Sequence, residues 1–169
     1  PYNKTIRSVS FDWVNMSDQH AKEQERTSRR RECILNAVKD ALYEHDYHKL
    51  TMEDVAARAG VGKSTIYRWW KHKSELIFEL FQHETAVIFD LDFSDSVQHN
   101  LEKQLNMLAD ALYHPIGRAV LVVMAEKRES SAQFFKEYLL VRREQIRKLI
   151  HIAILRQEIK ADYPFELML

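Results

Sequence analysis

Four residues near the middle of the chain, Gly62-Lys63-Ser64-Thr65, have the types that end a phosphate-binding loop. Such a loop follows the pattern G-x-x-x-x-G-K-[ST], in which the first glycine makes the turn and backbone amides surround the phosphates. Here the position of the first glycine holds Ala57. A nucleotide hydrolase also needs a buried strand before the loop, whereas the preceding stretch mixes charged and apolar residues at helical spacing. Nucleotide hydrolysis is therefore only a distant alternative.

Two short helices with a glycine turn between them account better for this region. Thr51 and Asp54 resemble a capping box at the start of a helix over about 52–59, and Gly60 suits its end. A second short helix is predicted over about 63–70. Two short helices joined in this way form the helix-turn-helix pattern, whose second helix enters the major groove of DNA.

The second of these helices has one apolar and one basic face. Ile66 and Trp70 are four residues apart and can face a core together with Val61. The side chains left on the outside are small, basic or aromatic: Lys63, Ser64, Tyr67, Arg68 and Lys71. Five basic residues and no acidic one occur over 58–73, and four basic residues occur over 26–31. Because such blocks neutralise phosphates, the pattern predicts DNA binding.

Composition excludes several other classes of protein. The chain has 169 residues but only 3 glycines and 3 prolines, which favours long helices. The single cysteine, Cys33, rules out an internal disulfide and fits a reducing compartment. No apolar run approaches the roughly 18 residues of a membrane span, so we expect a cytoplasmic protein without a membrane partner. No catalytic constellation or pair of metal-ligating histidines is legible, so we expect no enzyme, cofactor or metal.

The stretch LTMEDVAARAGVGKSTIYRWWKHKSEL, over 50–76, resembles the DNA-binding motif of TetR-family transcriptional regulators. The resemblance implies an all-α fold, with an N-terminal three-helix helix-turn-helix DNA-binding domain and a C-terminal helical domain for ligand binding and dimerisation. It also implies a homodimer that binds double-stranded DNA and responds to an unknown small-molecule effector. Such a regulator is usually a repressor that its ligand releases from a pseudo-palindromic operator. A DNA-binding module without an effector is the alternative.

The resemblance also implies roles for single residues. Base contacts are expected from the recognition helix: Lys63, Ser64 and Arg68. Contacts to the DNA backbone are expected from Thr51, Thr65, Tyr67, Trp69, Lys73, Arg29, Arg30 and Arg31. For Trp69, packing against the first helix is an equally open alternative. Cys33 lies beside the inward face of the first helix, and we expect it to be a small buried residue.

Three segments are expected along the chain. Residues 1–18 form a leader, either disordered or extended and docked on an apolar surface. Residues 19–73 form the DNA-binding domain, with a first helix over about 19–44. Residues 74–169 form a regulatory domain that ends early, without the two C-terminal helices of the family's dimer interface. Its helices are expected over about 74–89, 97–113 and 115–127, with a last one capped by Ser130 or Ser131 and reaching about residue 158.

The regulatory segment contains many apolar residues from which a ligand pocket can be built. The resemblance places such a pocket among its helices, and the candidate lining residues are Met107, Leu108, Ala111, Met124, Phe134, Phe135 and Tyr138. For each of them, a place in the packed core is the simpler interpretation.

Overall fold

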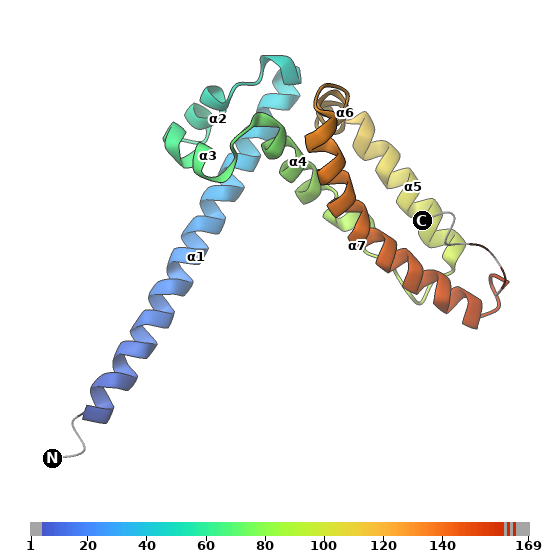
Figure 1. The fold of residues 1–169 in the computed structure, drawn as a ribbon, viewed down its shortest axis with the longest axis horizontal. Helices are drawn as coiled ribbons and strands as arrows, with labels where there is room; N and C mark the ends of the chain where they lie inside the picture. Colours follow the sequence, from blue (N-terminus) through green and yellow to red (C-terminus); the bar gives the residue numbers. More distant parts are fainter. Residues whose placement is uncertain (1–4, 161, 163, 165–169) are drawn as a thin grey trace.

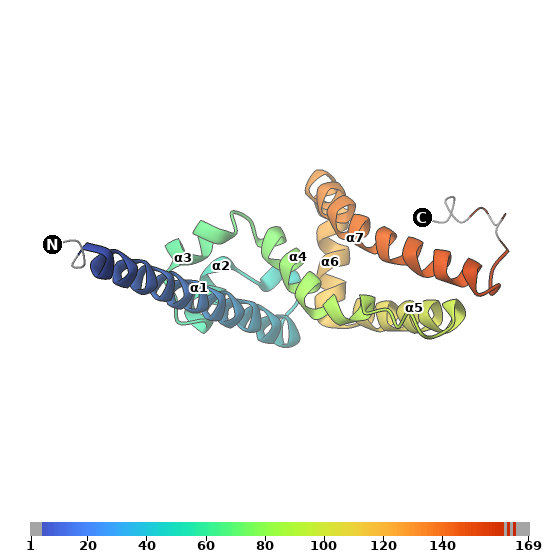
Figure 2. The ribbon, with the colours of Figure 1, turned by 90° about the horizontal axis from the view of Figure 1, so that it is seen from below.

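The computed structural model describes residues 5–160, 162 and 164, and within 21–160 it describes all side chains except those of 87, 89, 128–130, 135 and 137. Over these residues the fold is all-helical, with no strand. Figures 1 and 2 show an elongated molecule, with α1 to α3 towards one end and α5 to α7 towards the other, joined by α4. The elements are α1 (Thr5–Glu44), η1 (Tyr47–Lys49), α2 (Met52–Arg58), α3 (Lys63–Trp69), α4 (Lys73–Glu84), η2 (Ala86–Phe89), α5 (Val97–Tyr113), α6 (Pro115–Glu126) and α7 (Arg128–Leu155).

The first helix, α1, starts well before the predicted residue 19. It runs over Thr5–Glu44 and projects beyond α2 and α3 (Figure 1). Of the two alternatives for the leader, the extended one is therefore wrong for residues 5–18, which are helical; residues 1–4 lie outside the described part. The physical reason is that no proline or glycine occurs between Pro1 and the end of α1 at Glu44, so neither of these helix-breaking residues interrupts the helix. At its other end, α1 buries the apolar side chains of Ile34, Val38, Ala41 and Leu42.

Local hydrogen bonds set the ends of α2 as predicted. The Asp54 backbone N–H donates to the Thr51 hydroxyl over 3.1 Å, so Thr51 is the N-cap. At the C-terminal end, Gly60 has φ of +64°, a conformation that favours glycine. The amides of Gly60 and Val61 then donate to the carbonyls of Ala57 and Ala56, which is the Schellman arrangement. The turn leads directly into α3.

The linking helix α4 is shorter than predicted. It ends at Glu84, and a short 3₁₀ helix, η2, replaces the expected continuation to residue 89. Between them, the buried Thr85 donates its hydroxyl to the Phe81 carbonyl, and its Oγ1 lies 2.9 Å from the Tyr138 hydroxyl of α7. Such a side-chain contact competes with regular helix hydrogen bonding. Sequence periodicity cannot show this break because the partner, Tyr138, is 53 residues away.

A sharp corner separates α5 from α6, whose axes meet at 80°. The predicted bounds are confirmed to within one residue, with Ser96 capping α5 and Pro115 opening α6. Proline suits this position because the first helical N–H has no partner to lose. Gly117 lets the helices approach closely, since a Cβ there would lie 2.2 Å from the carbonyl oxygen of Ala111.

The last described helix, α7, begins earlier than predicted. It starts at Arg128 with Lys127 as its N-cap and ends at Leu155, so neither Ser130 nor Ser131 caps it. Ser131 lies inside the helix, where its hydroxyl donates to the Lys127 carbonyl over 2.7 Å. The reason is that only one residue, Lys127, connects the end of α6 to the start of α7. Residues 165–169 lie outside the part of the chain that the structure describes.

The core that holds these helices together runs from α1 to α7. One cluster of buried side chains includes residues from α1 to α4, α6 and α7, among them Val38, Ile66, Leu76 and Val120. The apolar side chains of α4 that are buried include Leu76, Ile77, Leu80 and Phe81. In the described residues, no single helix is both long and apolar enough to cross a membrane.

Candidate nucleic-acid interface

The recognition-helix candidate, α3, has the two faces that the sequence predicts. Ile66 is fully buried and Trp70, directly after the helix, is 2% exposed. Val61 is partly buried against the same core. The opposite face presents exposed side chains that are polar, basic or aromatic: Lys63, Ser64, Tyr67, Arg68 and Lys71. A short helix anchored at one face can offer the other to a DNA groove.

At the N-terminal end of α3, Lys63 forms an ion pair with a residue of α2. Its Nζ lies 3.2 Å from Oε1 of Glu53, and both side chains are largely exposed. The Lys63 ammonium lowers the pKa of the Glu53 carboxyl, mainly through a hydrogen bond. An exposed pair of this kind contributes little to stability. Lys63 can therefore leave Glu53 for a base edge at small cost.

At the other end of α3, aromatic rings support the basic side chains. Trp69 is partly buried and packs against the core. Its ring meets that of Trp70 edge to face, with centroids 5.6 Å apart. The Arg68 guanidinium lies 5.3 Å from the centre of the Trp69 ring. This cation–π contact holds Arg68 at the surface without neutralising its charge. Thr65, half-buried, lies between these ends.

Arg31 is part of an internal cross-link. Its guanidinium donates to both carboxylate oxygens of Glu79 on α4, with Nη2 2.5 Å from Oε2. The indole N–H of Trp70 donates to the same Oε2 over 2.8 Å. The Arg31 guanidinium also lies 5.5 Å from the centre of the Trp70 ring. Glu79 thus ties α1 and the end of α3 to α4, a contact that sequence analysis did not anticipate.

Lys73 also has internal partners. Its ammonium donates to the carbonyls of Tyr47 and Leu50, over 2.8 and 2.9 Å, and lies 3.9 Å from the centre of the Tyr47 ring. Partial burial lowers the pKa of Lys73. Two of its three N–H donors are therefore used to hold the loop before α2. Arg29 and Arg30 are exposed on α1, where Arg29 pairs with Glu25 one turn earlier.

Two further expectations are resolved by the geometry. The segment before Gly62 is α2 and not a strand, so the phosphate-loop reading of Gly62 to Thr65 has no structural basis. Cys33 is exposed rather than buried, because it lies at the edge of the α1 face whose neighbours Ile34 and Leu35 pack inward. Its thiol lies 3.7 Å from the Ala59 carbonyl.

Comparison with known proteins identifies the family. Residues 34–80, which contain most of the buried part of α1, the two short helices and most of α4, match the model for "Bacterial regulatory proteins, tetR family". This part of the chain belongs to the TetR family. The match and the relatives below support a DNA-binding transcriptional regulator rather than an enzyme.

Similar proteins align with different shares of the chain. The HTH-type transcriptional regulator YdeS of Bacillus subtilis is 26% identical over 79% of the chain and 69% of its own length. The HTH-type transcriptional regulator AqdR of Rhodococcus erythropolis is 29% identical over 74% of the chain, which spans 63% of AqdR. A crystal structure of a gamma-butyrolactone receptor, an ArpA-like protein, aligns with 85% of the chain and 74% of its own, at 20% identity and a TM-score of 0.48.

A cavity of about 290 Å³ lies between α1, α4, α5 and α6. Two of the predicted pocket residues, Met107 and Ala111, line it. Leu108, Met124 and Phe134 pack against the main core, and Tyr138 is buried in it. The side chain of Phe135 lies outside the described part. The cavity is therefore closer to α1 than the sequence suggested.

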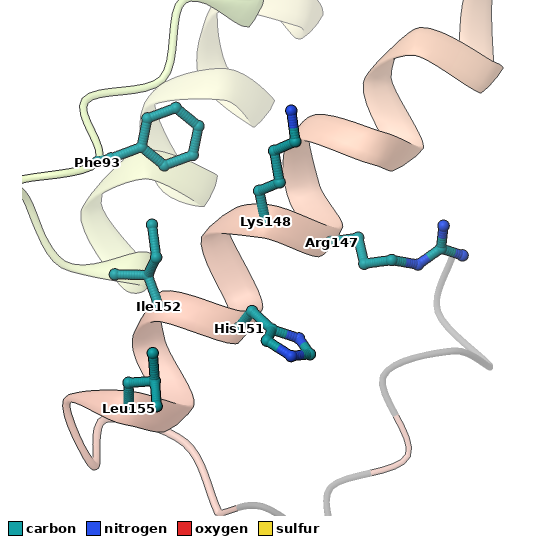
Figure 3. Close-up of a pocket in the computed structure, with 6 residues that line it drawn as sticks. All are labelled: Phe93, Arg147, Lys148, His151, Ile152 and Leu155. Atoms are coloured by element: carbon teal, nitrogen blue, oxygen red, sulfur yellow. The ribbon is translucent and has the colours of Figure 1, made fainter.

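A second hollow, of about 490 Å³, lies at the far end of α7 beside the loop before α5. Figure 3 shows Phe93 and Ile152 on one side of α7, whereas Arg147 and His151 point away from them. The lining residues thus spread around the helix and do not converge on one point. Among the described residues, no three histidine, cysteine, aspartate or glutamate side chains are grouped to hold a metal ion.

Proposed function

We propose that this TetR-family regulator is a cytoplasmic repressor that binds a pseudo-palindromic operator as a homodimer and is released by a small-molecule effector. The observation that carries the proposal is the exposed face of α3, supported from below by Ile66 and Trp70. In a dimer, two such helices must lie one DNA turn apart, about 34–36 Å, to read both half-sites. An effector that favours another separation weakens DNA binding by linkage, typically by about 1–3 kcal/mol.

Base readout is assigned to three exposed side chains of α3. Lys63 can donate to O6 or N7 of guanine once it leaves Glu53, and Arg68 can do the same from the next turn. The hydroxyl of Ser64, beside Lys63, can donate a hydrogen bond to a base-edge acceptor or accept one from a base-edge donor.

Contacts to the DNA backbone are assigned to the residues around this face. Tyr67 and Trp69 supply a hydroxyl and an indole N–H, and Thr51 and Thr65 supply hydroxyls, all of which are suitable partners for phosphate. Arg29 and Arg30 extend the basic surface along α1. For Arg31 and Lys73, the internal contacts support a second role, that of holding α1, α4 and the loop before α2 in place.

The test is selection of bound duplexes from sheared genomic DNA at two salt concentrations. We expect one inverted repeat to be enriched at both. Lys63→Ala should then change the preferred bases, whereas Lys103→Ala, which removes the same charge from an exposed position on α5, should not. Salt-sensitive binding without any enriched repeat would contradict the dimeric readout. An unchanged preference in Lys63→Ala would contradict the assignment of Lys63 as a base reader.

A further inference from the structure

The cavity between α1, α4, α5 and α6 lies where the DNA-binding segment meets the regulatory helices. Tyr43 lines it from the end of α1, which belongs to the segment matched by the family model. Phe81 and Glu84 line it from α4, and Met107 and Asp110 from α5. Any molecule that fills this cavity therefore touches both halves of the chain. Its volume, about 290 Å³, suits a small ligand.

The side chains around the cavity favour a positive charge. Among its lining residues, all of which the structure describes, the formal charges are the two carboxylates of Glu84 and Asp110. Two aromatic rings, those of Tyr43 and Phe81, line the same space. Carboxylates attract a cation directly, and ring faces attract it through their quadrupoles. An anion entering the cavity would be repelled by the carboxylate of Asp110, whereas Glu84 is paired with a cation of α1.

One of these two carboxylates, that of Glu84, already forms an ion pair with a lysine of the same chain. Lys39 of α1 donates to Oε2 of Glu84 over 2.6 Å, which links α1 to α4 at the edge of the cavity. Lys39 lies one helical turn before Tyr43, so both side chains are on the same face of α1. Glu84 raises the pKa of Lys39, chiefly by accepting this hydrogen bond. The His83 imidazole lies 3.5 Å from the other oxygen of Glu84.

We propose that this cavity binds a small organic cation with an aromatic or apolar group, and that the cation competes with Lys39 for Glu84. Asp110 and the rings of Tyr43 and Phe81 complete the site. Displacement of Lys39 opens the link between α1 and α4, which gives binding a route to the DNA-binding helices. The proposed cation binding does not depend on the proposed repressor function, whereas its effect on DNA binding rests on that function.

The first experiment is isothermal titration of the full chain at constant ionic strength with three probes of similar size. Benzyltrimethylammonium should bind, whereas the anion 3-phenylpropionate and the neutral 3-phenylpropionamide should not. Glu84→Gln and Asp110→Asn should each weaken binding of the cation by about tenfold, because each removes a charged partner. Glu102→Gln is the matched control, since Glu102 is exposed on α5 and pairs with Gln98 away from the cavity.

A further variant separates competition from simple structural support. Lys39→Met removes the internal cation and keeps a similar stem, so the probe cation should bind more tightly than to the wild-type chain. If all three probes bind alike, or if the cation binds unchanged to both Glu84→Gln and Asp110→Asn, the proposal is wrong. Unchanged binding in Lys39→Met would refute the competition.

The effect on DNA is measured separately, by adding benzyltrimethylammonium to the complex with the selected duplex. We expect it to dissociate the wild-type complex and to leave the complex of Asp110→Asn intact. If the chain binds the cation but selects no duplex, the proposed repressor function fails and the cation site remains. If DNA binding persists with the site saturated, the cavity has no regulatory effect on DNA.

Discussion

Arg31 of α1 and Glu79 of α4 form a two-point ion pair across 48 residues of sequence. The same carboxylate accepts from the indole of Trp70, so one side chain connects three helices of the DNA-binding segment. In the sequence, Arg31 belongs to a basic block and was assigned to DNA. The structure shows that a basic residue near a DNA-binding helix can have an internal partner and position that helix.

The first prediction concerns Glu79. Glu79→Ala leaves both Arg31 and the Trp70 indole without their acceptor and should lower the free energy of unfolding by about 2 kcal/mol. Glu79→Gln should lower the free energy of unfolding by less, because the amide oxygen of glutamine can still accept the hydrogen bond from the Trp70 indole. Chemical denaturation followed by tryptophan fluorescence measures both. Equal losses in the two variants would show that the ion pair, and not the indole contact, carries the stabilisation.

The second prediction separates the two roles of Lys73. Lys73→Met keeps the aliphatic stem but leaves the carbonyls of Tyr47 and Leu50 without their donor. We expect the free energy of unfolding to fall by about 2 kcal/mol. The slope of log K for DNA against log salt should change by less than the roughly one unit expected from losing a phosphate contact. If the slope changes by a full unit and the free energy of unfolding is unaltered, Lys73 contacts a DNA phosphate and the internal role is wrong.

The third prediction concerns the corner between α5 and α6. Gly117→Ala places a Cβ 2.2 Å from the Ala111 carbonyl oxygen, and the atoms it meets are backbone atoms that cannot turn away. We expect a loss of about 3 kcal/mol in stability. Gly62→Ala is the matched control, since its Cβ meets only the Ser64 hydroxyl at 3.7 Å. Similar thermal midpoints for the two variants would argue against close packing at this corner.

The fourth prediction concerns Tyr67, which is 45% exposed on the outer face of α3. Tyr67→Phe removes one hydroxyl and should weaken binding to specific and unrelated duplexes by a similar factor, because a phosphate contact does not depend on sequence. Binding titrations with both kinds of duplex measure this. Tyr113→Phe, altered at a highly exposed position on α5, should bind as the wild type does. Weakening confined to the specific duplex would make Tyr67 a base reader.

Local signals predicted much of the fold correctly. Thr51, Gly60 and Pro115 act on neighbouring backbone, so the bounds of α2, α3, α5 and α6 followed from the sequence to within one residue. Ile66 and Trp70 were correctly assigned to the core because helical periodicity places them together. The outward face of α3 followed from the same argument.

Features that depend on distant residues were not predictable in this way. The end of α4 at Glu84 goes with a contact between Thr85 and Tyr138, and the positions of Arg31 and Lys73 depend on partners at least 23 residues away. The cavity beside α1 depends on how four helices meet. A single sequence shows which face of a helix is apolar but not which helix will cover it.

The length of α1 has a mechanical consequence. A helix of 40 residues is about 60 Å long at 1.5 Å per residue. Its buried end is held at Lys39 and Arg31 by carboxylates of α4. A rotation of about 10° about that held end would move the far end of such a helix by roughly 10 Å, since displacement grows with length. Arg31 and Lys39 lie about 12 Å apart along the helix, so such a rotation requires a shift of about 2 Å at one ion pair. The motion grows along α1, which acts as a lever whose fulcrum is α4.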